Sequence, residues 1–456
     1  MSQRRIAIIC FLPDTGHVLP LLRLARLLCD HMTCQVTCFL PSKFESTVRQ
    51  FGFEYYCLRS LSKEFELGVV AELSNRSIFY NAFSNYSELR DCYWMPLREA
   101  VSHELGYLVE IMRTIQPHFL LCDSHAEFLD LYLRLSWCCG AKPIINRSEG
   151  THRRIHRPFI RTYGLSDRPH WVQGLVETAG SIVRKGSKCW RVIRHSKRRQ
   201  ITKSMRTSVE RRAEIVFKDY TATKTDLIYV TSGLAVLEQS ADIVKPESAK
   251  SREVVLAPTV YIPETALPSK LEGWLARRES GRVVYVCFGT MIALSEAYLV
   301  ELVQGFIDAQ VSVIWSLPRP RLNFLERLLA KHGLTDNFCV EEYVPQIVLL
   351  ASQKIGCFVT HGGAGSSQEA VVCGKPVLCI PFMWDQPYNC SLLVWLGIGR
   401  RLSKRHITRC QIAKEIRELL DNPIYAERAC CLSDKVRKLQ NSKRQSEWIH
   451  EMLEFS

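Results

Sequence analysis

Short apolar runs alternate with longer stretches of helical periodicity along the whole chain. We predict strands where such runs are rich in β-branched residues, at 6–12, 34–40, 119–122, 143–146, 226–231, 254–257, 283–288, 311–316, 338–342, 355–360 and 376–380. Strands that alternate with helices are typical of parallel sheets with helices on both faces. Because the pattern occurs in both halves, the sequence predicts an α/β protein with two doubly wound, Rossmann-like domains.

The two halves are separated by a region of weaker strand pattern. Between 240 and 281 the chain contains Pro258, Pro263, Pro268 and a polar stretch, which indicates a linker. We therefore expect four segments, and the last of them is a helix that packs back on the N-terminal domain. They are an N-terminal domain over 1–245, a linker with the first strand of the second domain over 246–280, a C-terminal domain over 281–436 and the final helix over 437–456.

The positive charge of the chain is concentrated in one segment. Residues 147–212 contain 18 basic and 4 acidic residues. Their net charge of +14 equals the formal net charge of the whole chain. A basic segment on a neutral body indicates a local surface feature, and no nucleic-acid-binding motif accompanies it. Its interleaved apolar residues suit peripheral contact with an anionic membrane surface. The alternative, which we favour, is a solvated helix pair over the acceptor site of the first domain.

The 19 cysteines lie mostly in apolar runs and none shows Cys-x-x-Cys spacing, which is typical of buried, reduced thiols. The apolar stretch that follows Met1 is only about eight residues long before Pro13, so we interpret it as a strand and not as a signal peptide. No run approaches the roughly 18 apolar residues that a transmembrane helix needs. We expect a soluble, cytoplasmic protein.

A glycine-rich turn follows the strand at 355–360 and precedes a helix. The free N–H groups at the beginning of a helix form an anion site. Gly362, Gly363 and Gly365 allow close approach of a diphosphate, and His361 can donate a hydrogen bond to a phosphate oxygen. The turn is therefore a candidate nucleotide-binding loop.

The helix after this loop contains a Ser-x-x-Glu sequence, Ser366 to Glu369. Glu369 can accept hydrogen bonds from a ribose diol, as acidic residues do in other nucleotide sites. The alternative is a capping box, in which Ser366 caps the helix and Glu369 is its reciprocal partner.

A second candidate site follows the first predicted strand. His17 lies between this strand and an amphipathic helix at 21–28, and ligands bind at this carboxyl edge of parallel sheets. The helix dipole disfavours the protonated imidazole, so His17 is suited to act as a neutral general base near pH 7. The alternative is a polar surface histidine.

These candidates belong to longer motifs. One motif runs in fixed order through Tyr343-Val344-Pro345-Gln346, His361-Gly362-Gly363-x-Gly365-Ser366-x-x-Glu369, Gly374-x-Pro376 and Pro381-x-x-Trp384-Asp385-Gln386-x-x-Asn389. It resembles the donor-binding signature of the family 1 nucleotide-sugar glycosyltransferases, the UDP-glycosyltransferases. The run 283–290 resembles the strand and phosphate-contacting loop that open the C-terminal domain of this family. The resemblance implies a GT-B-like fold, whose two domains face each other across a cleft and bind acceptor and donor respectively.

The resemblance also implies roles for individual donor-site residues. Tyr343 would stack on the uracil ring, the backbone of Val344 would pair with the base edge, and Gln346 would lie near base and ribose. Glu369 would hold the ribose hydroxyls. The other implied nucleotide-binding residues are Gly289, Thr290, His361, Gly363, Gly365 and Ser366, and the implied sugar-binding residues are Trp384, Asp385 and Gln386. The alternative for Tyr343 and Trp384 is that they are ordinary core aromatics.

Two positions depart from the plant pattern, because plant members have Trp in place of Tyr343 and commonly an amide in place of Gly365. These features are more similar to bacterial natural-product-modifying members. UDP remains the expected nucleotide and dTDP is the alternative.

In the first domain, Gly16-His17-x-x-Pro20 resembles the motif whose histidine deprotonates the acceptor hydroxyl. Asp123 resembles the aspartate that hydrogen-bonds this histidine and stabilises the imidazolium. The alternative is that Asp123 is the N-cap of the following helix, and His125 is then the nearest substitute.

The resemblance thus implies an inverting, metal-independent transferase with no cofactor other than its UDP-sugar co-substrate. It would move a hexose such as glucose to a hydroxyl of a small lipophilic acceptor. The chain has no Asp-x-Asp triplet that could hold a metal ion over the diphosphate. The alternatives are a dTDP-sugar-dependent natural-product glycosyltransferase, a UDP-sugar 2-epimerase, and a non-catalytic protein that binds nucleotide sugars or membrane surfaces.

Overall fold

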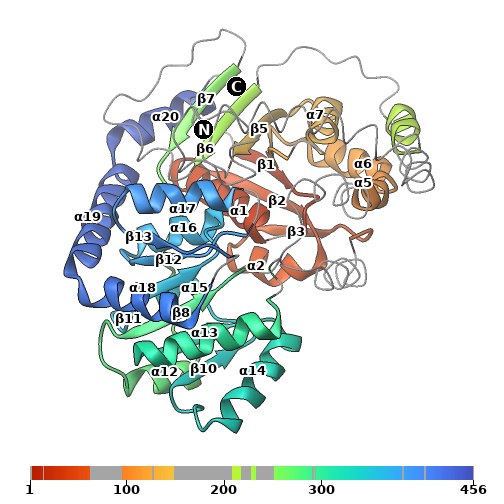
Figure 1. Cartoon of the computed structure of the whole chain (residues 1–456). Helices are drawn as coiled ribbons and strands as arrows, with labels where there is room; N and C mark the ends of the chain where they lie inside the picture. Colours follow the sequence, from red (N-terminus) through yellow and green to blue (C-terminus); the bar gives the residue numbers. More distant parts are fainter. Residues whose placement is uncertain are drawn as a thin grey trace, which may run out of the picture.

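The computed structural model describes residues 3–13, 15–61, 95–125, 128–147, 208–216, 227–232, 251–289, 292, 294–382, 385–404 and 407–454. These residues form two parallel β-sheets with helices packed on their faces (Figure 1). Most of the basic segment 147–212 and of the region 65–95 lies outside the described residues. None of the described helices is both long and apolar enough to cross a bilayer.

The first sheet has the strand order β3-β2-β1-β4-β5-β6-β7. Its strands are β1 (Arg4–Ile9), β2 (Cys34–Leu40), β3 (Glu54–Cys57), β4 (Phe119–Asp123), β5 (Lys142–Arg147), β6 (Leu227–Ser232) and β7 (Ser251–Leu256). The central strands are continuous apolar runs because helices cover both of their faces. Its helices include α1 (Thr15–His31), α2 (Glu45–Gln50), α5 (Met95–Ser102), α6 (Leu105–Ile115) and α7 (Leu129–Cys138), with a short 3₁₀ helix η1 (Ser42–Phe44).

A helix over 208–216 packs beside α5 at the end of the basic segment. Val209 is fully buried, and Nη1 of Arg212 donates a hydrogen bond of 2.9 Å to Oγ of Ser102. This end of the basic segment is therefore attached to the first domain.

The second sheet has the order β10-β9-β8-β11-β12-β13. Its strands are β8 (Val283–Cys287), β9 (Ser312–Ser316), β10 (Phe338–Glu341), β11 (Ile355–Thr360), β12 (Val377–Cys379) and β13 (Gly399–Arg401). Two apolar clusters cover its two faces. The helices are α12 (Ser269–Ala276), α13 (Glu296–Ala309), α14 (Arg319–Lys331), α15 (Gln346–Ala351), α16 (Ala364–Val372), α17 (Gln386–Trp395), α18 (Arg409–Asp421), α19 (Pro423–Gln440) and α20 (Lys443–Glu454).

One predicted strand lies in the other sheet. We expected the strand at 254–257 to open the second domain, but β7 pairs with β6 along its whole length, from Leu227 opposite Ser251 to Ser232 opposite Leu256. The proline-containing linker follows this strand, so the chain leaves the first sheet only after Leu256. The strand pattern alone does not say which sheet edge a strand joins.

Three further features differ from the sequence prediction. The edge strands β3 and β13 were not predicted, because β3 alternates exposed and half-buried residues and β13 is only 3 residues long. Helix α1 begins at Thr15, earlier than expected, and includes Pro20. Pro20 is the sixth residue of this helix, and because proline has no backbone N–H, the helix lacks one of its internal hydrogen bonds there.

The last helix returns to the first domain. Helix α20 contacts β7 and α1 (Figure 1), and Ile449 is fully buried in the core of the first domain. The backbone N–H of Ala257 donates a hydrogen bond of 3.1 Å to Oε1 of Gln445. His31 Nε2 lies 3.3 Å from Oγ of Ser446. The end of the chain is thus part of the first domain as well as of the second.

Candidate active site

The structure brings His17 and Asp123 together at the carboxyl edge of the first sheet. Strands β1 and β4 are neighbours, so the first turn of α1 lies beside the end of β4. Nδ1 of His17 lies 2.9 Å from Oδ2 of Asp123, and the side chains are 24% and 3% exposed. Because a carboxylate has no proton to give, Nδ1 is the donor. Nε2 is then the nitrogen that can accept a proton.

The Asp123 carboxylate is also held by the backbone. Its Oδ1 accepts a hydrogen bond of 2.7 Å from the N–H of His125. Helix α7 begins only at Leu129, with Phe128 at the N-cap position, so Asp123 is not the cap of this helix. The ring of His125 lies edge-on to that of His17, with 5.9 Å between the centroids. Asp123 is the residue that orients His17.

The glycine-rich loop lies at the corresponding edge of the second sheet, between β11 and α16. The imidazole of His361 packs against two glycines from different loops. A Cβ on Gly289 would lie 3.0 Å from this ring, and a Cβ on Gly363 would lie 2.6 Å from its Nε2. Both positions therefore require glycine for His361 to stand at the beginning of α16. The first N–H groups of this helix have no intrahelical acceptor and are suited to a phosphate.

Helix α17 holds the loop from behind. Gly362 has a φ of +78°, and a Cβ there would lie 2.2 Å from Sγ of Cys390. Nδ2 of Asn389 donates hydrogen bonds to the carbonyl of Gly362 at 2.9 Å and to Oδ2 of Asp385 at 2.7 Å. Asn389 thus ties a predicted sugar-binding carboxylate to the phosphate loop. Sequence reasoning assigned it no role, although it belongs to the motif.

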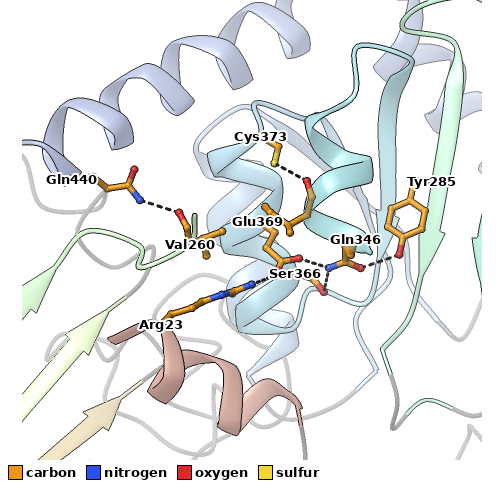
Figure 2. A network of polar contacts seen from close by, with 9 residues as sticks. Arg23, Val260, Tyr285, Gln346, Ser366, Glu369, Cys373 and Gln440 are labelled. Atoms are coloured by element: carbon orange, nitrogen blue, oxygen red, sulfur yellow. Dashed lines mark hydrogen bonds and ion pairs between the residues drawn. The ribbon is translucent and has the colours of Figure 1, made fainter. Parts of the chain in front are cut away.

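A polar network joins the predicted base and ribose residues (Figure 2). Nε2 of Gln346 donates to Oε2 of Glu369 at 2.7 Å and to Oγ of Ser366 at 3.2 Å. The hydroxyl of Tyr285 donates to Oε1 of Gln346 at 3.2 Å. Burial raises the pKa of Tyr285 well above its ordinary value, so the hydroxyl remains a donor. Gln346 is therefore fixed in one amide orientation.

This network excludes the capping box. Helix α16 begins at Ala364, and its N-cap residue Gly363 has no side chain to offer. Ser366 lies inside the helix and accepts from Gln346. The carboxylate of Glu369 accepts a hydrogen bond from Gln346 and does not turn back to the beginning of its own helix.

One partner of Glu369 was missed by sequence reasoning. Nη2 of Arg23, on α1 of the first domain, lies 2.6 Å from Oε1 of Glu369. The two side chains are 11% and 8% exposed, and Figure 2 shows Arg23 reaching from α1 to α16. No sequence signal links positions so far apart. An ion pair thus joins the helix that carries His17 to the helix that carries the predicted ribose-binding carboxylate.

The remaining predicted residues differ in exposure. Tyr343 is 79% exposed, which rules out the core-aromatic alternative, whereas Val344 beside it is buried. Oε1 of the buried Gln386 accepts a hydrogen bond of 2.9 Å from the N–H of Phe382. Thr290 and Trp384 lie outside the described residues. Within the described ranges, no group of three or more His, Cys, Asp and Glu side chains could hold a metal ion.

The chain consists of two Rossmann-like domains, and the candidate residues lie at the carboxyl edge of the sheet in each domain. This arrangement is the GT-B fold. Solved structures with this fold cover nearly the whole chain. Os79 from O. sativa, in complex with U2F and trichothecene, has a TM-score of 0.67 and 20% identity, and the match covers 99% of this chain and 100% of that one. UGT2 of Phytolacca americana has a TM-score of 0.64 at 16% identity, with 100% of both chains covered.

Sequence comparison finds a family similarity in the C-terminal half of the chain. Residues 245–443 match the profile of UDP-glucoronosyl and UDP-glucosyl transferase. UDP-glycosyltransferase 74C1 of Arabidopsis thaliana is 36% identical over 166 residues, which are 32% of this chain and 35% of the relative. UDP-glycosyltransferase 76C4 of the same plant is 32% identical over 183 residues, 38% of this chain and 39% of the relative. The alignments thus span little more than a third of these relatives. The C-terminal region of the chain is thus similar to the UDP-glycosyltransferase family.

Proposed function

We propose that this protein transfers a sugar from a UDP-sugar to a hydroxyl group of a small lipophilic acceptor, with inversion at the anomeric carbon. The observation that carries the proposal is the hydrogen bond between His17 and the buried carboxylate of Asp123. A histidine held in this tautomer is a general base, and a protein that only bound nucleotide sugars would not need one.

In the reaction, one proton moves from the acceptor to the protein, and the bond from the anomeric carbon to the diphosphate is replaced by a bond to the acceptor oxygen. Nε2 of His17 takes the proton of the acceptor hydroxyl as the oxygen attacks the anomeric carbon. The bond between this carbon and the diphosphate oxygen breaks, and UDP leaves from the opposite face of the sugar. Asp123 stabilises the imidazolium that forms, because its carboxylate already faces Nδ1.

The leaving diphosphate gains negative charge in the second domain. The N-terminus of α16, with its free N–H groups and helix dipole, stabilises this charge. His361 adds a further donor, packed between Gly289 and Gly363. The chain itself thus supplies groups that compensate the negative charge of the leaving diphosphate. We therefore propose a metal-independent transfer that needs no cofactor other than the UDP-sugar.

The remaining donor contacts follow the motif. Tyr343 presents its exposed ring to the uracil, and Glu369 accepts from the ribose hydroxyls in the network with Gln346. Asp385 and Gln386, at the beginning of α17, contact the sugar hydroxyls, and we propose a hexose such as glucose. The acceptor class rests on the neighbours, since Os79 is in complex with a trichothecene and UGT2 with pterostilbene.

The test combines nucleotide binding with turnover. Thermal unfolding is measured with UDP, dTDP, GDP or ADP at millimolar concentration, because a ligand that binds only the folded state raises the Tm. A rise in Tm with UDP and not with GDP or ADP supports the donor site. A rise with dTDP alone would mean that the donor is a dTDP-sugar and not a UDP-sugar. Release of UDP from UDP-glucose is then followed with a panel of phenolic and terpenoid alcohols, with and without EDTA.

The His17→Ala variant is the matched control for turnover. It should bind UDP like the wild type, because His17 lies in the first domain, and release UDP far more slowly. If this variant keeps full activity, His17 is not the base. If no nucleotide shifts the Tm of the wild type, the donor site itself is not competent.

A further inference from the structure

The ion pair between Arg23 and Glu369 is a contact between the two halves of the reaction centre. Helix α1 carries His17 in its first turn and Arg23 further along the same helix. The side chain of Arg23 extends from α1 to the second domain, where its Nη2 lies 2.6 Å from Oε1 of Glu369 (Figure 2). A residue of the acceptor-side domain therefore contacts the carboxylate that we assign to the donor ribose.

The burial of both groups makes this contact specific. A charged side chain is rarely this buried unless a partner of opposite charge compensates it. Glu369 is 8% exposed, and Arg23 is 11% exposed. Removing either partner would leave a buried charge without its counter-charge, so the two groups hold each other in place.

The contact also leaves lone pairs of the Glu369 carboxylate available to a diol. A carboxylate has about four lone-pair positions, two on each oxygen. Arg23 occupies one position on Oε1, and Gln346 occupies one on Oε2. Among the residues that the structure describes, no other group takes a position on these oxygens, so one on each is left for the two ribose hydroxyls. Arg23 and Gln346 thus brace the carboxylate from two sides and fix the direction of its remaining lone pairs.

We infer that Arg23 is a positioning residue of the donor site. It holds Glu369 in the orientation that suits the ribose hydroxyls, and it ties the helix of the general base to the nucleotide site. This inference rests on the proposed function, because it assigns Arg23 to the same donor site. It predicts that a substitution in the acceptor-side domain weakens nucleotide binding.

The experiment measures the Kd of UDP by calorimetry for the full-length wild type, Arg23→Gln, Arg23→Lys, Glu369→Gln and the double variant. Arg23→Gln should weaken UDP about tenfold, the order expected from losing a charge-assisted hydrogen bond to a buried carboxylate. Arg23→Lys should recover part of this loss, because it keeps the charge but not the planar fork. In the Glu369→Gln background, Arg23→Gln should change the Kd by less than about threefold, since the partner is already gone.

Arg26→Gln is the matched control on the same helix. Arg26 forms a more exposed pair with Asp30, in which the side chains are 55% and 43% exposed, and its removal should leave the Kd unchanged. In steady-state assays, Arg23→Gln should raise the KM of the donor and leave that of the acceptor unchanged. A merely structural role of Arg23 would not separate the two KM values.

The outcomes distinguish this inference from the proposed function. If the wild type binds no UDP, the proposed function fails. If the wild type binds UDP and Arg23→Gln binds it equally well, only the inference fails. Tighter binding by Arg23→Gln would also overturn it, because Arg23 would then compete with the ribose. If Arg23→Gln does not fold, Arg23→Lys and Glu369→Gln provide the same comparison.

Discussion

The imidazole of His17 and the carboxylate of Asp123 meet at 2.9 Å although 106 residues separate them in the sequence. Their proximity follows from the strand order, in which β1 and β4 are neighbours and end at the same edge. The backbone N–H of His125 holds the second oxygen of the carboxylate at 2.7 Å. The chain itself therefore holds the pair in place, through the sheet and the backbone of His125.

Asp123→Asn should keep the shape of this site and lose most of its activity. An amide cannot compensate the imidazolium, and it can present a donor to Nδ1 and so favour the wrong tautomer. We expect kcat to fall about a hundredfold or more, with the Kd of UDP unchanged. The control is Asp130→Asn on α7, where the aspartate pairs with Arg98 and is 50% exposed. Equal losses in both variants would argue against a specific role of Asp123.

Gly362→Ala should destabilise the second domain. Its φ of +78° disfavours any side chain, and the new Cβ would lie 2.2 Å from Sγ of Cys390. We expect the free energy of unfolding to fall by about 2 kcal/mol or more, measured by urea denaturation. Gly365→Ala is the matched control, because nothing lies within 4 Å of a Cβ there and alanine favours the helix. A stable Gly362→Ala protein would contradict the assigned packing of α17 on the loop.

Tyr343→Ala should weaken UDP without lowering stability. The side chain is 79% exposed, so its removal costs little packing, whereas stacking on a base contributes about 1–3 kcal/mol in other proteins. We expect the Kd of UDP to rise about tenfold and the Tm without ligand to stay within a degree or two. Tyr343→Trp should bind at least as tightly as the wild type, because its ring is larger. An unchanged Kd in Tyr343→Ala would remove this residue from the donor site.

The stability of the first domain should depend on the protonation of His118. Its Nδ1 accepts a hydrogen bond of 2.9 Å from the N–H of Arg5, and partial burial, with the nearby charges of Arg5 and Arg4, lowers its pKa. The unfolded chain, with a histidine pKa of about 6.5, then binds more protons than the folded one. The contribution is complete above about pH 6.5 and is lost as the pH falls toward the folded pKa.

His118→Asn should therefore reduce the difference in Tm between pH 7.5 and pH 5.5, because asparagine can accept the same hydrogen bond without titrating. His332→Asn is the control in the second domain, since this histidine ends α14 and should not alter the pH dependence of the first. A variant at 118 with the wild-type pH dependence would show that another group titrates.

The sequence predicted the interior of the fold better than its edges. Interior strands such as β4 are continuous apolar runs, and a run of this kind is recognisable without knowing its neighbours. Edge strands bury little, so β3 carries a pattern of exposed and half-buried residues that resembles a loop. The sheet that β7 joins depends on long-range pairing with β6, which no local pattern records.

The same distinction applies to the candidate site. Residues within one local motif, such as His361 and Glu369, were predicted as donor-site residues, because their order along the chain carries the information. The contact of Glu369 with Arg23 could not be predicted, since it depends on how two separately recognisable domains pack. The role of Asn389 was hidden for a different reason: its partner is the carbonyl of Gly362, and backbone acceptors have no sequence signature.

The chain passes between the two domains twice, and the two passages are bonded to each other. After β7 it continues through Pro258 and Val260, whose carbonyls accept hydrogen bonds of 2.6 and 3.2 Å from Nε2 of Gln440 at the end of α19. Nε2 of Gln445 in turn donates to the carbonyl of Gln440 at 3.1 Å. The two crossings therefore form one hydrogen-bonded connection, so that side chains of the returning segment, as well as the backbone of the linker, hold the second domain to the first at this point.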